Sequence, residues 1–107
     1  MANHLDILAF GAHPDDVELS CAGTILKEIA SGKKIGIVDL TRGELGTRGS
    51  AELRVQEAKK AASLLGVVCR ENLSFRDGFL INDEQHQIAV IEICLLYTSD
   101  AADDLYR

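Results

Sequence analysis

The segment His13-Pro14-Asp15-Asp16 holds the side chains of this sequence that are best suited to chemistry. Pro14, the only proline in the chain, disfavours helical torsions at His13, so the imidazole is expected to project from an extended segment into a cleft. Catalytic zinc sites take three protein ligands from His, Asp or Glu and leave one position open for water. His13 and Asp16 are two candidate ligands, and Asp15 is a candidate general base.

Together these groups suit the hydrolysis of an amide. A bound metal lowers the pKa of its water and polarises a carbonyl, while the carboxylate of Asp15 takes a proton and later passes it to the leaving amine. The residues alone leave a simpler alternative open. Asp15 or Asp16 then caps a helix, which stabilises its free N–H groups by about 1 kcal/mol, and His13 is only a turn residue.

The elements around this motif predict an α/β fold. An apolar run over residues 5–12 is typical of a buried strand, and a four-residue apolar period from Val17 to Gly32 predicts a helix. A second apolar run follows at 35–40, and this order implies parallel pairing through a right-handed crossover. His13 should then lie at the carboxyl end of a strand, where open α/β sheets bind ligands.

Further elements are predicted downstream. A loop at 41–49 precedes a helix over about 50–65, a weaker strand at 72–75, and a helix that Asn82 caps. The glycines of the loop have neither the P-loop nor the dinucleotide spacing, so we expect a mobile lip over the cleft. Gly23, inside the first helix, is less favourable than Ala by about 1 kcal/mol and suggests a close approach of another backbone.

Composition narrows the class of protein. A chain of 107 residues allows one domain at most, and a formal net charge of −6 argues against a nucleic-acid-binding surface. No segment reaches the roughly 20 apolar residues that a membrane helix needs. Three widely spaced cysteines fit reduced thiols, which favours a cytoplasmic protein.

The C-terminal segment differs from the rest. Residues 94–107 resemble the translation of a transposase-end sequencing adapter. We therefore interpret residues 1–93 as the N-terminal part of a larger domain and residues 94–107 as a non-native tail. The alternative is an ordinary helix end followed by an acidic tail.

Several motifs in order along the chain resemble the PIG-L or LmbE-like deacetylase family. They are the segment 12–16 after its apolar run, Glu18 and Gly23-Thr24 in the next helix, the loop 41–49, Arg54 with Glu57-Ala58, and Arg76-Asp77-Gly78. The resemblance implies a Rossmann-like parallel sheet with flanking helices, here truncated to its N-terminal half. It also implies a hydrolase with one zinc ion that removes the N-acetyl group of an N-acetylglucosaminyl conjugate.

Within the family the sequence looks most like the bacillithiol-biosynthesis enzymes, which act on N-acetylglucosaminyl malate in the cytoplasm and assemble into homo-oligomers. The resemblance implies that His13 and Asp16 bind zinc, that Asp15 is the general base and that Arg54 contacts substrate. Arg54 is then suited to a bidentate pair with the malate carboxylate, and otherwise is an ordinary surface arginine.

Two further residues have open roles. Glu44 meets sugar hydroxyls or is simply solvated, and Asp77 orients a sugar hydroxyl or only forms a turn with Gly78. The family's third zinc ligand and a histidine that stabilises the oxyanion belong to a motif beyond Ile93. His86 is not expected to replace that ligand. We therefore expect the chain as written to be inactive or nearly so, and a non-catalytic sugar-conjugate or nucleotide-binding module remains the competing hypothesis.

Overall fold

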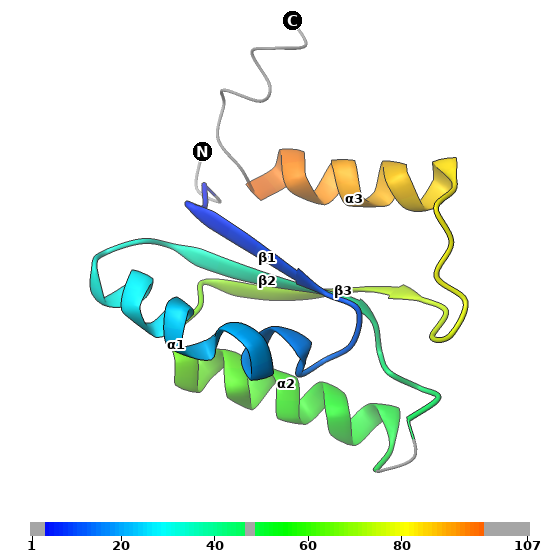
Figure 1. The fold of residues 1–107 in the computed structure, drawn as a ribbon, viewed down its shortest axis with the longest axis horizontal. Helices are drawn as coiled ribbons and strands as arrows, with labels where there is room; N and C mark the ends of the chain where they lie inside the picture. The colour runs from blue at the N-terminus through cyan, green and yellow to red at the C-terminus, as the bar shows by residue number, and fades with distance from the viewer. Residues whose placement is uncertain (1–3, 47–48, 98–107) are drawn as a thin grey trace, which may run out of the picture.

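A parallel sheet with helices on both faces forms the body of the chain (Figure 1). The computed structural model describes residues 4–46 and 49–97. In order along the chain the elements are β1 (Ile7–Gly11), α1 (Asp16–Ala30), β2 (Ile35–Thr41), α2 (Ala51–Leu65), β3 (Cys69–Phe75) and α3 (Glu84–Tyr97). The predicted α/β class is confirmed. None of the helices in these ranges has the length and apolar content to cross a bilayer.

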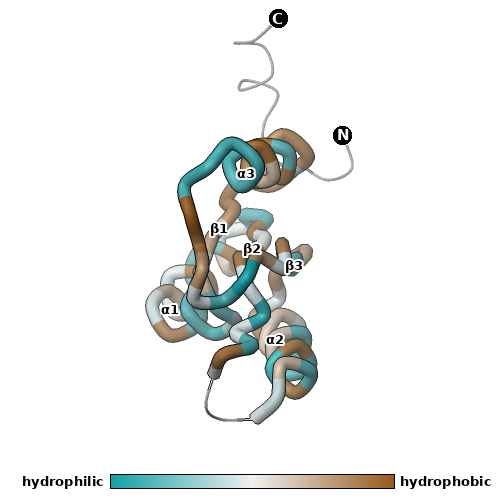
Figure 2. Tube along the Cα trace, turned by 90° about the vertical axis from the view of Figure 1, so that its right-hand side faces the viewer, coloured by the Kyte–Doolittle hydropathy of each residue, from teal (hydrophilic) through white to brown (hydrophobic). Residues whose placement is uncertain are grey.

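The strands lie in the order β1-β2-β3, and both neighbouring pairs are parallel. Helices α1 and α2 cover one face of the sheet and α3 lies over the other (Figures 1 and 2). The central strand β2 is the most deeply buried, with Ile37 and Val38 fully inaccessible to solvent. Strand β2 pairs with a strand on each side and has helices over both faces. Because all pairings are parallel, the carboxyl ends of the three strands meet at one edge of the sheet.

The apolar pattern of the first helix is confirmed where it faces the sheet. Val17 and Ile25 of α1 form one buried cluster with Ile35 and Ile37 of β2. The close approach predicted at Gly23 is wrong, because a Cβ built there would meet no atom within 4 Å. This glycine is on the exposed side of α1.

Element boundaries differ from prediction at two places. Strand β3 begins at Cys69, which pairs with Gly36 of β2, three residues before the predicted start at residue 72. The apolar pattern missed this start because Arg70 is charged and yet buried by ion pairs. Asp83, and not the predicted Asn82, caps the N-terminus of α3. Its carboxylate accepts a hydrogen bond from His86 N at 2.9 Å. Helix α3 continues to Tyr97, so the proposed boundary after Ile93 falls inside it, and residues 98–107 of the proposed tail lie outside the described residues.

Arg70 joins three elements through a buried ionic cluster. Its guanidinium donates to both carboxylate oxygens of Asp39 on β2, at 2.7 and 2.9 Å, and to both oxygens of Glu18 on α1, at 2.9 Å each. The side chains of Arg70 and Asp39 are only 6% and 3% exposed. Burial alone would lower the pKa of Arg70, but these hydrogen bonds raise it. The cluster therefore holds the first turn of α1 against the sheet.

Replacing the cation of this cluster should destabilise the fold strongly. In Arg70→Met, Asp39 and Glu18 are left as neighbouring carboxylates without a counter-charge, so we expect a loss of about 3–5 kcal/mol in the free energy of unfolding. Urea denaturation at neutral pH measures it. The control is Arg76→Met, since Arg76 is exposed and stacks on Phe79 at 3.8 Å, a contact worth about 0.5–1 kcal/mol. Equal losses of unfolding free energy in Arg70→Met and Arg76→Met would contradict the role of Arg70 in holding α1 against the sheet.

Candidate functional site

The candidate site lies where the three parallel strands end. His13 follows β1, the loop from Arg42 follows β2, and Asp77 follows β3. These segments border a cavity of about 380 Å³. Its lining residues are His13, Asp15, Asp16, Leu45, Gly46, Arg54, Asp77 and Gly78. The structure thus brings together every predicted site residue except Glu44, which lies beside the cavity in the same loop.

His13 and Asp16 are spaced to contact a single ion. Nδ1 of His13 lies 3.4 Å from Oδ2 of Asp16, and the same Oδ2 accepts a hydrogen bond from His13 N at 2.9 Å. Two ligands on a tetrahedral zinc, each bound at about 2.0–2.2 Å, lie roughly 3.3–3.5 Å apart. The donor types and their separation therefore fit one zinc ion.

The capping alternative finds no support in this geometry. Asp15 occupies the N-cap position of α1, but its side chain makes no capping hydrogen bond. The carboxylate of Asp16 accepts from His13 N, which precedes the helix. Asp15 also has φ = 104°, a left-handed conformation that is strained for a residue with a Cβ, at about 1–3 kcal/mol. Strain of this kind is common at functional sites, and it leaves the Asp15 carboxylate at the cavity, 56% exposed.

Asp77 fixes the state of the His13 ring. Its buried carboxylate contacts Nε2 of His13 through Oδ1 at 2.7 Å and accepts from Leu45 N through Oδ2 at 2.9 Å. The Leu45 N–H, and then His13, lower the pKa of Asp77, while the hydrogen bond to Asp77 raises the pKa of His13. An ionised carboxylate can only accept, so Nε2 carries the proton. In the neutral ring, Nδ1 then offers its lone pair next to Asp16.

Reciprocal hydrogen bonds connect the loops after β2 and β3. Glu44 accepts from Asp77 N at 2.9 Å, which lowers the pKa of Glu44, while Asp77 accepts from Leu45 N. A Cβ on Gly78 would lie 2.9 Å from Cδ1 of Leu45, so the two loops are in close contact. The described part of the predicted lip is therefore hydrogen-bonded to the loop after β3. Residues 47–48 of the lip lie outside the described residues.

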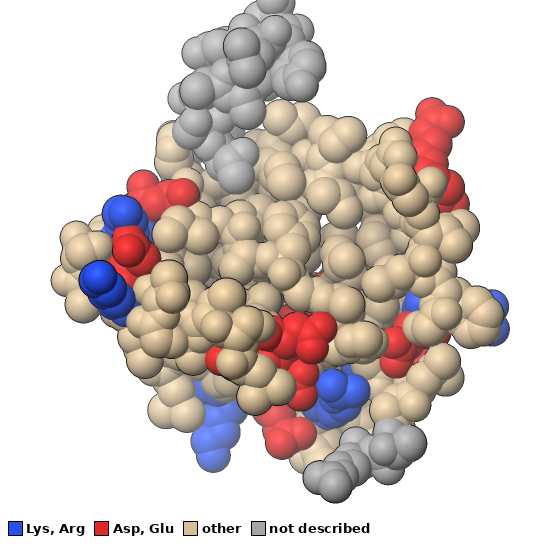
Figure 3. All heavy atoms as spheres, in the orientation of Figure 1, with Lys and Arg blue, Asp and Glu red and all other residues tan. Residues whose placement is uncertain are grey.

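Arg54 reaches the same region from α2. Nη1 donates to Gly43 O and Nη2 to Pro14 O, both at 3.0 Å, and Nη2 lies 3.7 Å from Oδ2 of Asp15. Sequence reasoning missed the two carbonyl contacts, because a backbone acceptor has no side-chain signature. Figure 3 shows acidic side chains gathered where α1 begins, with basic side chains beside them.

The described residues offer two candidate zinc ligands, His13 and Asp16, whereas a catalytic zinc takes three from the protein. Among residues 4–46 and 49–97, no group of three or more His, Cys, Asp or Glu side chains is arranged to hold a metal. His86 does not line this cavity. Its ring bonds to Asp83 and makes an edge contact with Phe75 at 4.3 Å.

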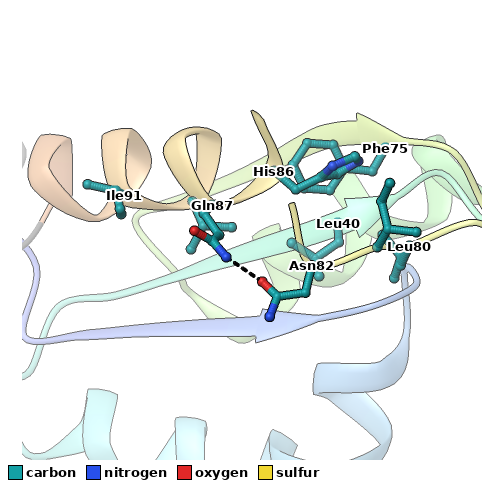
Figure 4. Close-up of a pocket in the computed structure, with 9 residues that line it drawn as sticks. Leu40, Phe75, Leu80, Asn82, His86, Gln87 and Ile91 are labelled. Atoms are coloured by element: carbon teal, nitrogen blue, oxygen red, sulfur yellow. Dashed lines mark hydrogen bonds between the residues drawn. The ribbon is translucent and has the colours of Figure 1, made fainter. Parts of the chain in front are cut away.

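A larger hollow lies elsewhere and has a different character. An open groove of about 600 Å³ runs between α3 and the ends of β2 and β3 (Figure 4). Apolar side chains dominate its lining, which comprises Leu40, Phe75, Leu80, Ile81, Asn82, His86, Gln87, Val90 and Ile91. Since its polar groups bond within the chain, as Gln87 does to Asn82, the groove is a poorer candidate for hydrolysis than the smaller polar cavity.

Comparison with known proteins places this geometry in a family. A family model described as "PIG-L: GlcNAc-PI de-N-acetylase" matches residues 8–103. "Uncharacterized deacetylase YaiS" of Escherichia coli (strain K12) is 39% identical over 109 residues, covering 91% of this chain and 58% of that protein. "Probable N-acetyl-alpha-D-glucosaminyl L-malate deacetylase 2" of Bacillus anthracis is 33% identical over 90 residues, covering 75% of this chain and 40% of that protein.

A solved structure agrees with the sequence matches. The N,N'-diacetylchitobiose deacetylase of Pyrococcus horikoshii superposes with a TM-score of 0.76 at 31% identity, over 81% of this chain and 35% of its own. The chain therefore spans between about a third and three-fifths of the length of these relatives. Because the family model covers most of the sequence, including the His13-to-Asp16 motif, the chain belongs to the PIG-L family.

Proposed function

We propose that this chain supplies the N-terminal half of a zinc-dependent hydrolase that removes the N-acetyl group of an N-acetylglucosaminyl conjugate. The observation that carries the proposal is the 3.4 Å separation of His13 Nδ1 and Asp16 Oδ2, which suits two ligands of one zinc ion. Membership in the PIG-L family supports the reaction, and the names of two relatives describe deacetylation of amino-sugar compounds.

The residues of this chain have separate tasks in that reaction. His13 and Asp16 hold the ion, which when bound polarises an amide carbonyl and makes water more acidic. Asp15 takes a proton from the attacking water and later donates it to the departing amine. Its carboxylate suits this task because it makes no helix cap and lines the cavity.

Substrate and setting form part of the same proposal. The name of the Bacillus anthracis relative supports N-acetylglucosaminyl malate as the substrate. We also propose the setting that the family resemblance implies, which is bacillithiol biosynthesis in the cytoplasm by a homo-oligomeric parent protein. We propose that Glu44, which is exposed beside the cavity, meets sugar hydroxyls. For Asp77 we propose that it orients His13 and not a sugar hydroxyl, because both its oxygens already bond to protein groups.

We further propose that the chain as written is inactive, since the third ligand and the oxyanion histidine belong to a later segment. Loss of one oxyanion donor alone lowers the rate by about 100- to 1000-fold.

The roles of His13 and Asp15 can be separated in the full-length protein encoded by the uninterrupted reading frame. Asp15→Asn should lower kcat by about 10²- to 10⁴-fold and keep its zinc, because only proton transfer is removed. His13→Ala should lose both zinc and activity. Acetate release from N-acetylglucosaminyl malate and metal analysis of the purified proteins measure these effects. Zinc content unchanged by His13→Ala would favour a non-catalytic binding module, and acetate release by the 107-residue chain would overturn its predicted inactivity.

The orienting role of Asp77 makes a separate prediction. In Asp77→Asn the amide oxygen can accept from Leu45 N, and the NH₂ group then faces Nε2 of His13 and favours a proton on Nδ1. We expect zinc affinity in the full-length protein to fall about 10- to 100-fold, as for other partners of metal-bound histidines. Competition with a chelator measures it.

The matched control is Asp83→Asn. Asp83 also bonds to a histidine ring, that of His86, but lies outside the cavity, so zinc affinity should not change. If Asp77→Asn binds zinc as tightly as the parent, His13 does not need this carboxylate to present Nδ1.

A further inference from the structure

The backbone at Asp15 needs support from its surroundings. Its φ of 104° and ψ of −21° place it in the left-handed region, and Asp15 is one of only two described non-glycine residues with a positive φ. The Asp15 side chain offers no local compensation, since it makes no capping hydrogen bond. Another group must hold the peptide that leads into this residue.

Arg54 is that group. Its Nη2 donates at 3.0 Å to Pro14 O, the carbonyl of the peptide bond that precedes Asp15, and lies 3.7 Å from the Asp15 carboxylate. Its Nη1 donates at 3.0 Å to Gly43 O in the loop after β2. The side chain is only 20% exposed, so the guanidinium lies between the two segments and does not extend into solvent.

The loop after β2 is shaped around this guanidinium. A Cβ on Gly43 would lie 2.2 Å from Nη1 of Arg54, and a Cβ on Gly46 would lie 2.8 Å from the same atom. Gly43 also has φ = 66°, and Gly46 N donates back to Gly43 O at 3.0 Å, closing a tight turn. Two glycines therefore allow the turn to lie directly against Arg54.

We propose that Arg54 is a positioning residue, which holds the strained Asp15 peptide and the turn 43–46 in place through Pro14 O and Gly43 O, and is not primarily a partner for a substrate carboxylate. This rests on the proposed role of Asp15 as general base. Both terminal nitrogens of Arg54 already donate to the backbone, and a planar guanidinium with fixed donors suits two carbonyls from different loops. Asp15 would then be placed for proton transfer before any substrate arrives.

Kinetics of the full-length protein separate positioning from substrate binding. A lysine lacks the planar pair of donors, so Arg54→Lys should misplace Asp15 and lower kcat by about 100-fold, with KM for N-acetylglucosaminyl malate changed less than about threefold. A rise in KM with kcat unchanged would instead identify a substrate-binding arginine and overturn the proposal.

Hydrogen exchange in the 107-residue chain tests the same role without substrate or metal. In Arg54→Lys the amide of Gly46, which bonds to Gly43 O, should exchange about fivefold faster or more, as expected for loss of one hydrogen bond. The amide of Val38 in the buried central strand should keep its rate, which shows that the fold is retained. An unchanged rate at Gly46 would overturn the proposal whatever the activity. If the full-length protein deacetylates nothing, the proposed function fails while the exchange result still decides the role of Arg54.

A pair of glycine substitutions gives a second test. Gly46→Ala should lower Tm in the parent chain, where the new Cβ would lie 2.8 Å from Nη1 of Arg54 and 3.1 Å from Gly43 O. It should have a smaller effect in an Arg54→Ala background, where only the contact with Gly43 O remains. Gly23→Ala is the matched control, because a Cβ there meets nothing within 4 Å, and it should not lower Tm in either background. Equal destabilisation by Gly46→Ala in both backgrounds would show that the turn is not built around Arg54.

Discussion

The contact between the buried Asp77 carboxylate and Nε2 of His13 determines what the rest of the site can do. An imidazole has two nitrogens, and only the one without a proton can accept a metal. By engaging Nε2, Asp77 assigns the lone pair to Nδ1, which lies beside Asp16. The carboxylate can keep this role because the Leu45 N–H stabilises its charged form. The loop after β2 therefore influences His13, the candidate ligand after β1, through Asp77, which follows β3.

This coupling depends on the order of the strands. Parallel strands bring their carboxyl ends to one edge of the sheet, so residues distant in sequence meet there. His13 and Asp77, separated by 64 positions, follow the two outer strands of the order β1-β2-β3, and Leu45 in the loop after the central strand bonds to Asp77. The buried central strand β2 thus positions the outer strands, and with them the hydrogen-bonded loops that follow the three strands.

The sequence predicted the fold better than it predicted the contacts. Apolar periodicity located β1, α1 and β2 because these elements bury apolar side chains, but it missed the start of β3, where the buried face contains the charged Arg70. The motif from His13 to Asp16 was identified from residue types, whereas the contacts that Asp77 and Arg54 make with it were not predicted. Asp77 was expected to orient a sugar hydroxyl or only to form a turn, since Asp-Gly is a common turn signal. Arg54 was expected to contact substrate or to lie at the surface, because its acceptors are main-chain carbonyls that no sequence pattern reveals.

Electrostatics explains how the chain tolerates so many acids at one place. Asp15, Asp16 and Glu18 begin α1, where the helix dipole and free N–H groups favour negative charge. The guanidinium of Arg70 bonds to both Glu18 and Asp39, and Nη2 of Arg54 lies 3.7 Å from the Asp15 carboxylate. Each arginine thus has its own set of partners, and the carboxylate of Asp16 lies 3.4 Å from Nδ1 of His13. In the proposed site, a divalent cation bound by His13 and Asp16 would supply positive charge that the two arginines do not provide there.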